Sequence, residues 1–214
     1  ILLGDEVLHI DGYGVTIEDI IEEEETQTVY NLKKVDGNHN FYAEDFLAHN
    51  RFVPPCCFAA GTQILLSNGD SKDIEDIVVG DEVMGWNGEI LEASKVIDID
   101  HKHTVESHWE ACKRLGDEPS LYTINDTGIE FTPEHPFLTK EGWKSLVPDL
   151  SQEPYKSEAP AKELKVGDSI NVNGLWEEIK EIKVARSNPN EIVYNITVDK
   201  IHSYIANGII VHNK

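Results

Sequence analysis

The stretch VYNITVDKIHSYIANGIIVHN, residues Val193 to Asn213, decides the fold of this chain. The runs EIVYNITV and SYIA are rich in β-branched and aromatic residues and are bounded by turn-forming residues, so they predict short β-strands. The stretch closes on His-Asn, and the residue behind it is Lys214 rather than Ser, Thr or Cys. A His-Asn ending of this kind is a candidate for chemistry at a peptide bond.

A second copy of this stretch lies near the start of the chain, as VYNLKKVDGNHNFYAEDFLAHN, residues Val29 to Asn50. His39 and His202 each open a twelve-residue tail that closes on His-Asn. Their offset is 202 − 39 = 163, and the same offset relates Gly4 to Gly167 in the preceding Gly-Asp motifs. The first fifty residues are therefore a second copy of the last fifty or so.

Most other elements are also predicted to be short strands. The predicted strands are TQILLS, DEVMGW, SLYTIN, GIEFT and SINVN. Asn68-Gly69 predicts a hairpin turn. The segment 104–116 predicts one short helix, with Lys113 and Arg114 in its last turn and Gly116 as its cap. We therefore expect an all-β fold with one short helical insertion.

Two further segments are interpreted as connections rather than core. RFVPP, residues 51–55, contains two prolines that restrict φ and predicts a stiff linker, which we extend to residue 56. The polar, proline-bearing segment of about 148–163 predicts a mobile insertion.

The composition narrows the function classes. Lys and Arg number 18 and Asp and Glu 40, a net charge of 18 − 40 = −22, which repels phosphate and argues against a nucleic-acid partner. No apolar run approaches the ~18 residues of a membrane span, so we expect no membrane partner. The three cysteines are an odd number, which argues against a disulfide framework.

Two more segments carry side chains that could take part in a reaction. CCFAAGTQILLSNG, residues 56–69, presents adjacent thiols, and FTPEHPFLTKEGW, residues 131–143, presents Thr, Glu and His within four positions. A cysteine thiol can attack the carbonyl of the peptide bond before it and form a thioester. An asparagine side chain can attack its own backbone carbonyl and release the chain behind it.

These three segments, in this order, resemble the conserved blocks of the Hint family, the hedgehog and intein self-processing domains. The likeness is greatest to bacterial and phage intein-like domains, and it covers 57–213, which is 213 − 57 + 1 = 157 residues. The resemblance implies a horseshoe of β-strands with pseudo-twofold internal symmetry. It implies autocatalytic cleavage of the host polypeptide, acting once on its own chain, with protein splicing as a further outcome.

The resemblance also implies roles at the N-terminal end of the unit. Family spacing puts the attacking cysteine four residues before Gly-Thr, which is Cys57, so the scissile bond is Cys56–Cys57. The Thr and His that hold and protonate this amide in the family match Thr132 and His135. Histidine suits proton transfer near neutral pH because its pKa lies there.

At the other end, the resemblance implies cyclisation of Asn213 and cleavage of the Asn213–Lys214 bond, assisted by His212 and His202. Two positions depart from the family pattern. Many inteins carry Asp where this chain has Asn195, and an amide cannot exchange a proton as a carboxylate does. Splicing needs Ser, Thr or Cys where this chain has Lys214, whose amine is mostly protonated at neutral pH. We therefore expect cleavage more than ligation.

The N-terminal copy resembles the C-terminal half of another Hint unit. His39, His49 and Asn50 match the histidines and asparagine of the second copy, and form a candidate second cleavage end. The half that would carry the thiol is expected upstream in a parent chain, as a pairing partner of residues 1–50. Two arrangements stay open: residues 1–50 are an appendage, or they replace 164–213 in the fold. We favour pairing within 57–213.

A further cluster consists of His101, His103, His108 and Cys112, which are residue types that bind zinc. Their spacing matches no tight zinc motif, so we interpret this region as a polar surface insertion and expect no metal and no cofactor. The partner is the flanking polypeptide of the chain itself. A cytoplasmic or virion-associated location is expected. The alternative function is an inactive Hint-like β module with a structural role in a larger phage or bacterial protein.

Overall fold

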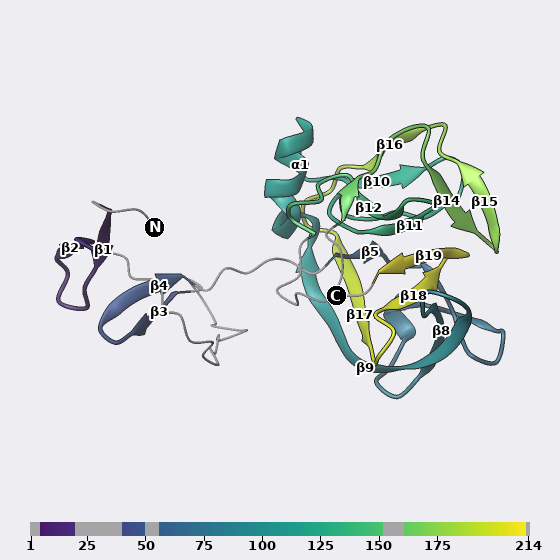
Figure 1. The fold of residues 1–214 in the computed structure, drawn as a ribbon, viewed down its shortest axis with the longest axis horizontal. Coiled ribbons are helices and arrows are strands. Elements are labelled where there is room, and N and C mark those ends of the chain that lie inside the picture. Colours follow the sequence, from purple (N-terminus) through teal and green to yellow (C-terminus); the bar gives the residue numbers. More distant parts are fainter. Residues whose placement is uncertain (1–4, 20–39, 50–55, 152–160, 213–214) are drawn as a thin grey trace. The chain divides into compact units, whose positions relative to one another are not determined.

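The computed structural model describes residues 5–19, 40–49, 56–151 and 161–212. The chain divides into two compact units, Ile1–Val53 and Pro54–Lys214, and each is described by itself (Figure 1). No helix of the described residues has the length and apolar character needed to cross a membrane.

The described part of the second unit consists of short strands, two 3₁₀ turns and one α-helix (Figure 1). The strands are β5 (Phe58–Ala59), β6 (Gln63–Leu65), β7 (Ser71–Asp73), β8 (Glu82–Trp86), β9 (Leu91–Thr104), β10 (Leu121–Ile124), β11 (Phe137–Thr139), β12 (Gly142–Ser145), β13 (Lys162–Glu163), β14 (Ser169–Val172), β15 (Leu175–Glu178), β16 (Ile182–Arg186), β17 (Ile192–Val198), β18 (Ser203–Ala206) and β19 (Ile209–His212). The helical elements are η1 (Ile74–Asp76), η2 (Val105–His108) and α1 (Trp109–Leu115). The predicted class, all-β with one short helix, is confirmed.

The strands of this unit form three sheets within the described residues. The largest has the order β13-β12-β11-β14-β19-β18-β6-β7, with β15 paired to β14. A second sheet has the order β5-β17-β9-β8, and β10 pairs with β16. Strands from the last fifty residues therefore pair with strands that follow Cys57, and the C-terminal segment lies inside the fold.

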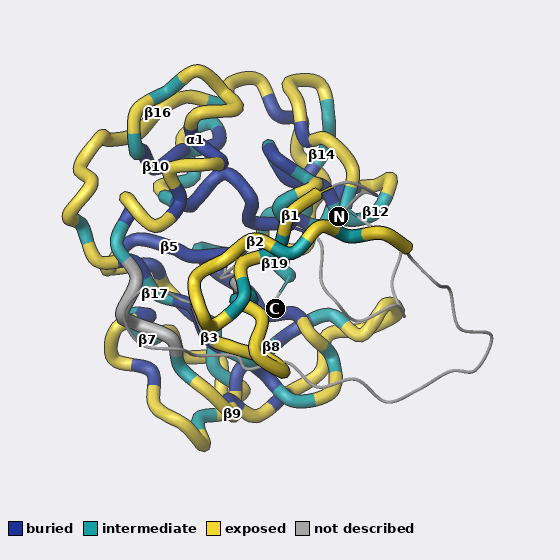
Figure 2. Tube along the Cα trace, turned by 90° about the vertical axis from the view of Figure 1, so that its left-hand side faces the viewer, coloured by how far each residue is buried: buried dark blue, intermediate teal, exposed yellow. Residues whose placement is uncertain are grey.

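Alternating apolar residues along these strands build one main core. In Figure 2 the buried residues follow the inner strands, and the exposed residues lie on the outer turns. The largest buried side chains include Tyr204, Phe58, Phe131 and Phe137. Burying side chains of this size contributes about 1.5–3 kcal/mol each, so these aromatic residues dominate the packing around β5 and β11.

Local signals in the sequence are matched by turns and caps in the structure. The Asn68-Gly69 turn joins β6 to β7, and Gly69 has φ +90°, a conformation that glycine adopts without strain. The predicted helix is present, with its first turn as η2 and the rest as α1. Gly116 ends α1 in the left-handed conformation at φ 85°.

Two predicted segments differ from the structure. In the predicted strand 128–132 only Phe131 is paired, as isolated bridges to Phe58 and Tyr122. In the predicted insertion 148–163, Ser151 is buried and β13 pairs in parallel with β12, so its described ends belong to the fold. Residues 152–160 lie outside the described part.

The first unit is described as two β-hairpins. Strand β1 (Glu6–Leu8) pairs with β2 (Gly14–Thr16), and β3 (Asn40–Ala43) pairs with β4 (Phe46–His49). An isolated bridge between His9 and Phe46 joins the two hairpins.

Candidate functional site

Cys57, the predicted nucleophile, lies directly before β5 and is completely buried. Its backbone N–H donates to Thr132 Oγ1 at 2.9 Å. Its carbonyl oxygen accepts the backbone N–H of Thr132 at 3.0 Å, and the Thr132 hydroxyl at 3.4 Å. Because the nitrogen of Cys57 belongs to the Cys56–Cys57 peptide bond, Thr132 directly holds the predicted scissile amide.

The residues from Thr132 to His135 form a tight turn over this bond. The N–H of His135 donates to the carbonyl of Thr132 at 3.0 Å. Pro133 follows Thr132, where its fixed φ favours a turn. The carbonyl of Glu134 accepts the thiol of Cys56 at 3.3 Å. The turn therefore contacts both cysteines.

The imidazole of His135 is completely buried, with its ring centroid 4.0 Å from that of Phe58. Burial, together with the charges of His212 and His108, lowers the pKa of His135 well below its usual range. Neither ring nitrogen makes a hydrogen bond of good geometry with a described residue. Backbone groups of Cys56 and His212 nevertheless lie near enough to oppose that shift. The ring is therefore neutral, and a neutral imidazole can take up a proton and return it.

The C-terminal end of the domain meets the same turn. His212 ends β19, and its N–H donates to the carbonyl of Pro136 at 3.0 Å. Its ring packs edge-on against Trp143, with ring centroids 4.9 Å apart. The structure thus brings Cys57, Thr132, His135 and His212 together around one segment.

Of the other residues predicted for the C-terminal step, the structure describes His202. Asn213 and Lys214 lie outside the described residues. His202 is exposed, has φ +47°, and directly precedes Ser203, which pairs with His212. It therefore lies next to the end of β19.

Asn195, the departure from the family pattern, lies on β17 and is buried. Its side-chain oxygen has no hydrogen-bond partner among the described residues. A buried carbonyl oxygen without a hydrogen bond destabilises the fold by roughly 1–3 kcal/mol, so Asn195 lowers stability relative to a buried amide that is paired.

The sequence reasoning missed a buried pair beside the site. His108 Nδ1 and Glu134 Oε1 are in hydrogen-bond contact, and both side chains are almost completely buried. The interpretation of the helical region as a surface insertion was therefore wrong for His108. The available signal was Glu134 itself, because a carboxylate between Phe131 and Phe137 needs a partner when it is buried.

Cys112, the other helical residue of the candidate cluster, is also buried rather than at the surface. Burial raises the pKa of its thiol to about 11, and its sulfur accepts the N–H of Ser120 at 3.4 Å. It behaves as a packed thiol. The side chains of His101 and His103 lie outside the described part, and the described residues contain no group of three metal ligands.

Tyr204 is a second residue that the sequence reasoning missed. Its ring is completely buried, 6.2 Å from that of Phe58, and its hydroxyl has no hydrogen-bond partner among the described residues. Burial, followed by the charges of Cys57 and Cys56, raises the pKa of Tyr204 well above its usual range. The hydroxyl therefore stays protonated close to the two thiols.

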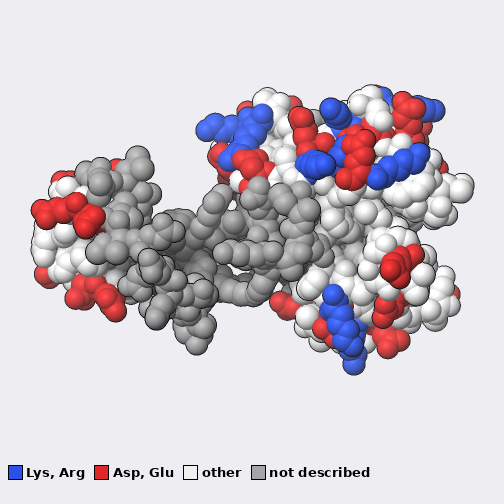
Figure 3. Space-filling model, in the orientation of Figure 1, with Lys and Arg blue, Asp and Glu red and all other residues white. Residues whose placement is uncertain are grey.

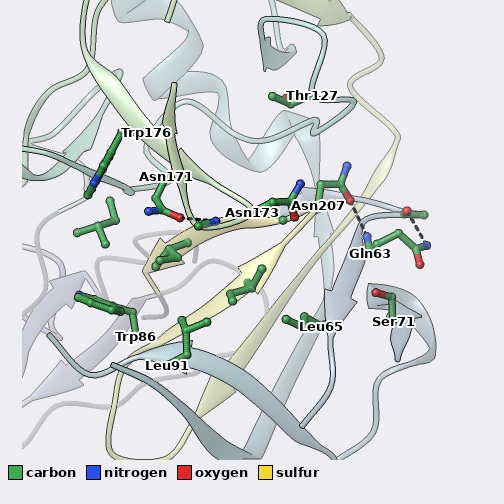
Figure 4. A pocket seen from close by; sticks show the side chains of 16 residues that line it. Gln63, Leu65, Ser71, Trp86, Leu91, Thr127, Asn171, Asn173, Trp176 and Asn207 are labelled. Atoms are coloured by element: carbon green, nitrogen blue, oxygen red, sulfur yellow. Dashed lines mark hydrogen bonds between the residues drawn. The ribbon is translucent and has the colours of Figure 1, made fainter. Parts of the chain in front are cut away.

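A separate cleft of about 970 Å³ lies in the second unit, and none of the predicted catalytic residues lines it. Trp86 and Trp176 lie on its wall, and the N–H of Gln63 donates to Asn207 Oδ1 at 2.7 Å (Figure 4). No lining residue is charged. Outside the cleft, acidic and basic side chains are intermixed on the visible face of this unit (Figure 3).

Of the candidate second cleavage end, the structure describes one residue, His49. His49 ends β4, and His39 and Asn50 lie outside the described residues.

Comparison with known proteins agrees with this geometry. The family model described as Hom_end-associated Hint matches residues 57–114. The bacterial intein-like domain from Clostridium thermocellum is 27% identical, with a TM-score of 0.53 over 73% of this chain and 98% of that chain. The DnaB intein from Synechocystis sp. PCC 6803 is 23% identical, with a TM-score of 0.53 over 74% of this chain and 99% of that chain. A search of the curated proteins gave no match.

The fold and the matched family model define the second unit as a Hint domain. Within that class its solved structural counterparts are a bacterial intein-like domain and inteins, and its first part matches the Hom_end-associated type.

Proposed function

We propose that this Hint domain cleaves the backbone of its own chain, in a single turnover and without a cofactor. The observation that carries the proposal is the hydrogen bond from the Cys56–Cys57 amide to Thr132, with the buried neutral His135 beside it. A held amide, a thiol on its C-terminal residue and a nearby proton carrier are the groups that an N–S acyl shift needs.

The first step is an isomerisation in which all atoms balance. The sulfur of Cys57 attacks the carbonyl carbon of Cys56, a C–S bond forms, and the C–N bond breaks. The thiol proton passes to His135 and from there to the nitrogen of Cys57, which becomes an amine. Water or an added thiol then attacks the thioester and releases the sulfur of Cys57 as a thiol, separating residues 1–56 from the rest.

The second step acts at the other end of the domain. The side-chain nitrogen of Asn213 attacks its own backbone carbonyl carbon, a succinimide forms, and the bond to Lys214 breaks. A proton moves from the amide of Asn213 to the departing amine. By resemblance, His212 and His202 assist this transfer and the oxyanion that precedes it. The contact of His212 with Pro136 supports a link between the two ends.

Cleavage is favoured over ligation for two reasons. Lys214 presents an amine that is mostly protonated at neutral pH, so it is a poor acceptor for the thioester. Asn195 replaces a carboxylate that helps to coordinate the two steps in many inteins. The Hint domain would therefore cleave its chain at one or both ends, with splicing as a minor product.

Substitution tests this proposal against an inactive structural module. Cys57→Ala should stop release of residues 1–56, and Asn213→Ala should stop loss of Lys214. If both variants gave the same fragments as the parent chain, the assignment of these residues would be wrong. If the parent chain kept its mass for days with and without thiol, the inactive module would be the better account.

A further inference from the structure

The hairpin of β3 and β4 in the first unit repeats the hairpin of β18 and β19 in the second unit, pair for pair. In the first unit Ala43 pairs with Phe46 across β3 and β4. In the second unit Ala206 pairs with Ile209 across β18 and β19, and 206 − 43 = 209 − 46 = 163. All four pairs of the first hairpin have a counterpart in the second at this offset, so the repeat extends from sequence to register.

The neighbouring strand also joins each hairpin at the same place. A bridge connects His9 to Phe46 in the first unit. The corresponding pair in the second unit, Val172 and Ile209, joins β14 to β19. The offset is again 172 − 9 = 163, so the first unit reproduces the arrangement of β14, β18 and β19.

The turn of each hairpin repeats the same hydrogen bond. The N–H of Ile10 donates to the carbonyl of Asp45 at 2.7 Å, and the N–H of Asn173 donates to that of Gly208 at 2.7 Å. Asp45 has φ 70° and Gly208 has φ 77°. Asp45 therefore adopts the left-handed backbone conformation, which costs a non-glycine residue roughly 1–2 kcal/mol. The turn of the first hairpin thus has the same backbone shape as the turn of the second, although it lacks the glycine.

What differs between the copies is their burial. Tyr42 is 47% exposed and Phe46 is 37% exposed in the first unit. Their counterparts, Ile205 and Ile209, are 6% and 0% exposed. Tyr42 and Phe46 lie on opposite faces of the hairpin, so the first unit exposes an apolar side chain on each face that its own described residues do not cover.

The second unit shows what covers this surface. Ile64 on β6 pairs with Ala206, and Phe137 on β11 pairs with Val211. Both strands come from the N-terminal half of the Hint domain. Within this chain that half is already paired with β14, β18 and β19, so another copy of it is needed to cover the first unit.

We propose that the first unit is a docking site for the N-terminal half of a Hint domain. The occupant would bring a strand equivalent to β6 alongside Ala43 and a strand equivalent to β11 alongside Ala48, at the offset of 163 residues. Strand pairing would supply the register, and burial of Phe46 and Val7, which lie on one face of the strands, would supply the binding free energy. This proposal needs no cleavage chemistry and stands apart from the proposed function.

Charge decides how the association must be measured. The described residues of the first unit include seven acidic side chains and no Lys or Arg, and its visible charged atoms are acidic (Figure 3). Residues 56–151, taken as the probe, carry seven basic and nineteen acidic residues, which is 7 − 19 = −12. Like charges repel, so the experiment belongs in about 1 M salt, where the Debye length is about 3 Å.

The test is hydrogen exchange on the full chain with and without a polypeptide of residues 56–151. The proposal predicts that amides of 41–48 exchange at least about tenfold more slowly with the probe, while those of 203–212 do not change. Phe46→Ser in the full chain should abolish the effect. Tyr13→Ser is the matched control, because the strand register makes Leu175 its counterpart, and Leu175 stays 69% exposed in the second unit.

Phe46→Ser could also abolish the protection by unfolding the first unit, so a second variant is made in the probe instead. Ile64→Asp in the probe removes the apolar residue that pairs with Ala206 in the second unit, and it should abolish the protection without changing the full chain. No slowing in 41–48 would overturn the proposal. Slowing in 203–212 instead, or slowing in 41–48 that depends on chain concentration without probe, would overturn it too, because the occupant would then be different.

Discussion

The backbone N–H of Cys57 donates to the hydroxyl of Thr132 across 75 positions of sequence, at 2.9 Å. This hydrogen bond joins the first residue of the Hint domain to the turn that carries His135. The nitrogen involved is the one that must leave as an amine if the thiol attacks Cys56. The contact therefore connects the fold with the proposed chemistry.

Removing this hydroxyl while keeping its shape should slow the N-terminal step. We expect Thr132→Val to reduce thiol-induced release of residues 1–56 by about 10²-fold, as for loss of one positioned polar group at a reacting amide. Thr139→Val is the matched control, because the Thr139 hydroxyl donates to Gly142 at 2.6 Å, away from Cys57. Gel densitometry measures the rate at which residues 1–56 are released. Equal rates for Thr132→Val and the parent would show that the Thr132 hydroxyl does not assist this step.

The buried neutral state of His135 predicts a pH dependence of stability. Its pKa is lowered in the folded state, so below about pH 6.5 the unfolded chain binds a proton that the folded chain does not. Stability therefore falls as pH falls. Between about pH 7.5 and about pH 5.5 this single group costs about 1.4 kcal/mol.

Replacement by glutamine isolates that contribution. In urea titrations at the two pH values, His135→Gln should lose less stability than the parent by about 1.4 kcal/mol. The exposed His202→Gln should behave like the parent. If His135→Gln lost as much stability between the two pH values as the parent does, the histidine would not be held neutral.

The pair of Glu134 and His108 should matter more for stability than ion pairs at the surface. Glu134→Ala leaves a buried imidazole without its partner and should destabilise the domain by about 3 kcal/mol. Glu141→Ala, which removes an exposed partner of Lys144, should cost much less, because water screens that pair. The free energy of unfolding in urea measures both, and similar costs would contradict the buried pair.

Restoring an acceptor should change the products. With a flanking domain on each side, Lys214→Cys should yield ligated flanks, because a thiol accepts an acyl group from a thioester far better than an ammonium does. Adding Asn195→Asp should raise the ligated share further. Mass spectrometry counts the species, with Lys214→Arg as control. Absence of ligated product from both cysteine variants would show that the acceptor is not what limits splicing.

Much of the fold was predictable because its signals are local. The Asn68-Gly69 turn and the Gly116 cap follow from short-range patterns, and the repeat follows from comparing two stretches 163 residues apart. The structure confirms each of them. The three sequence blocks also located the segment around which Cys57, Thr132, His135 and His212 meet.

The rest depends on contacts between distant residues. Glu134 and His108 are 26 positions apart, and no local pattern indicates that the helix packs its histidine onto the turn. Strand 128–132 was overpredicted because Phe131 makes its pairs as single bridges rather than in a ladder. The hydroxyl of Tyr204 near the thiols could not be foreseen, since a tyrosine in a strand usually indicates packing alone.

The central claim is that Cys57 attacks the bond before it, and the chain itself supplies the substrate. The direct measurement is the intact mass of the purified chain over time, with and without a small thiol, beside Cys57→Ala. The account predicts that thiol releases residues 1–56 from the parent, that the new N-terminus is Cys57, and that Cys57→Ala releases neither fragment. Release of the same fragments from Cys57→Ala, or none from a folded parent under thiol, would contradict it.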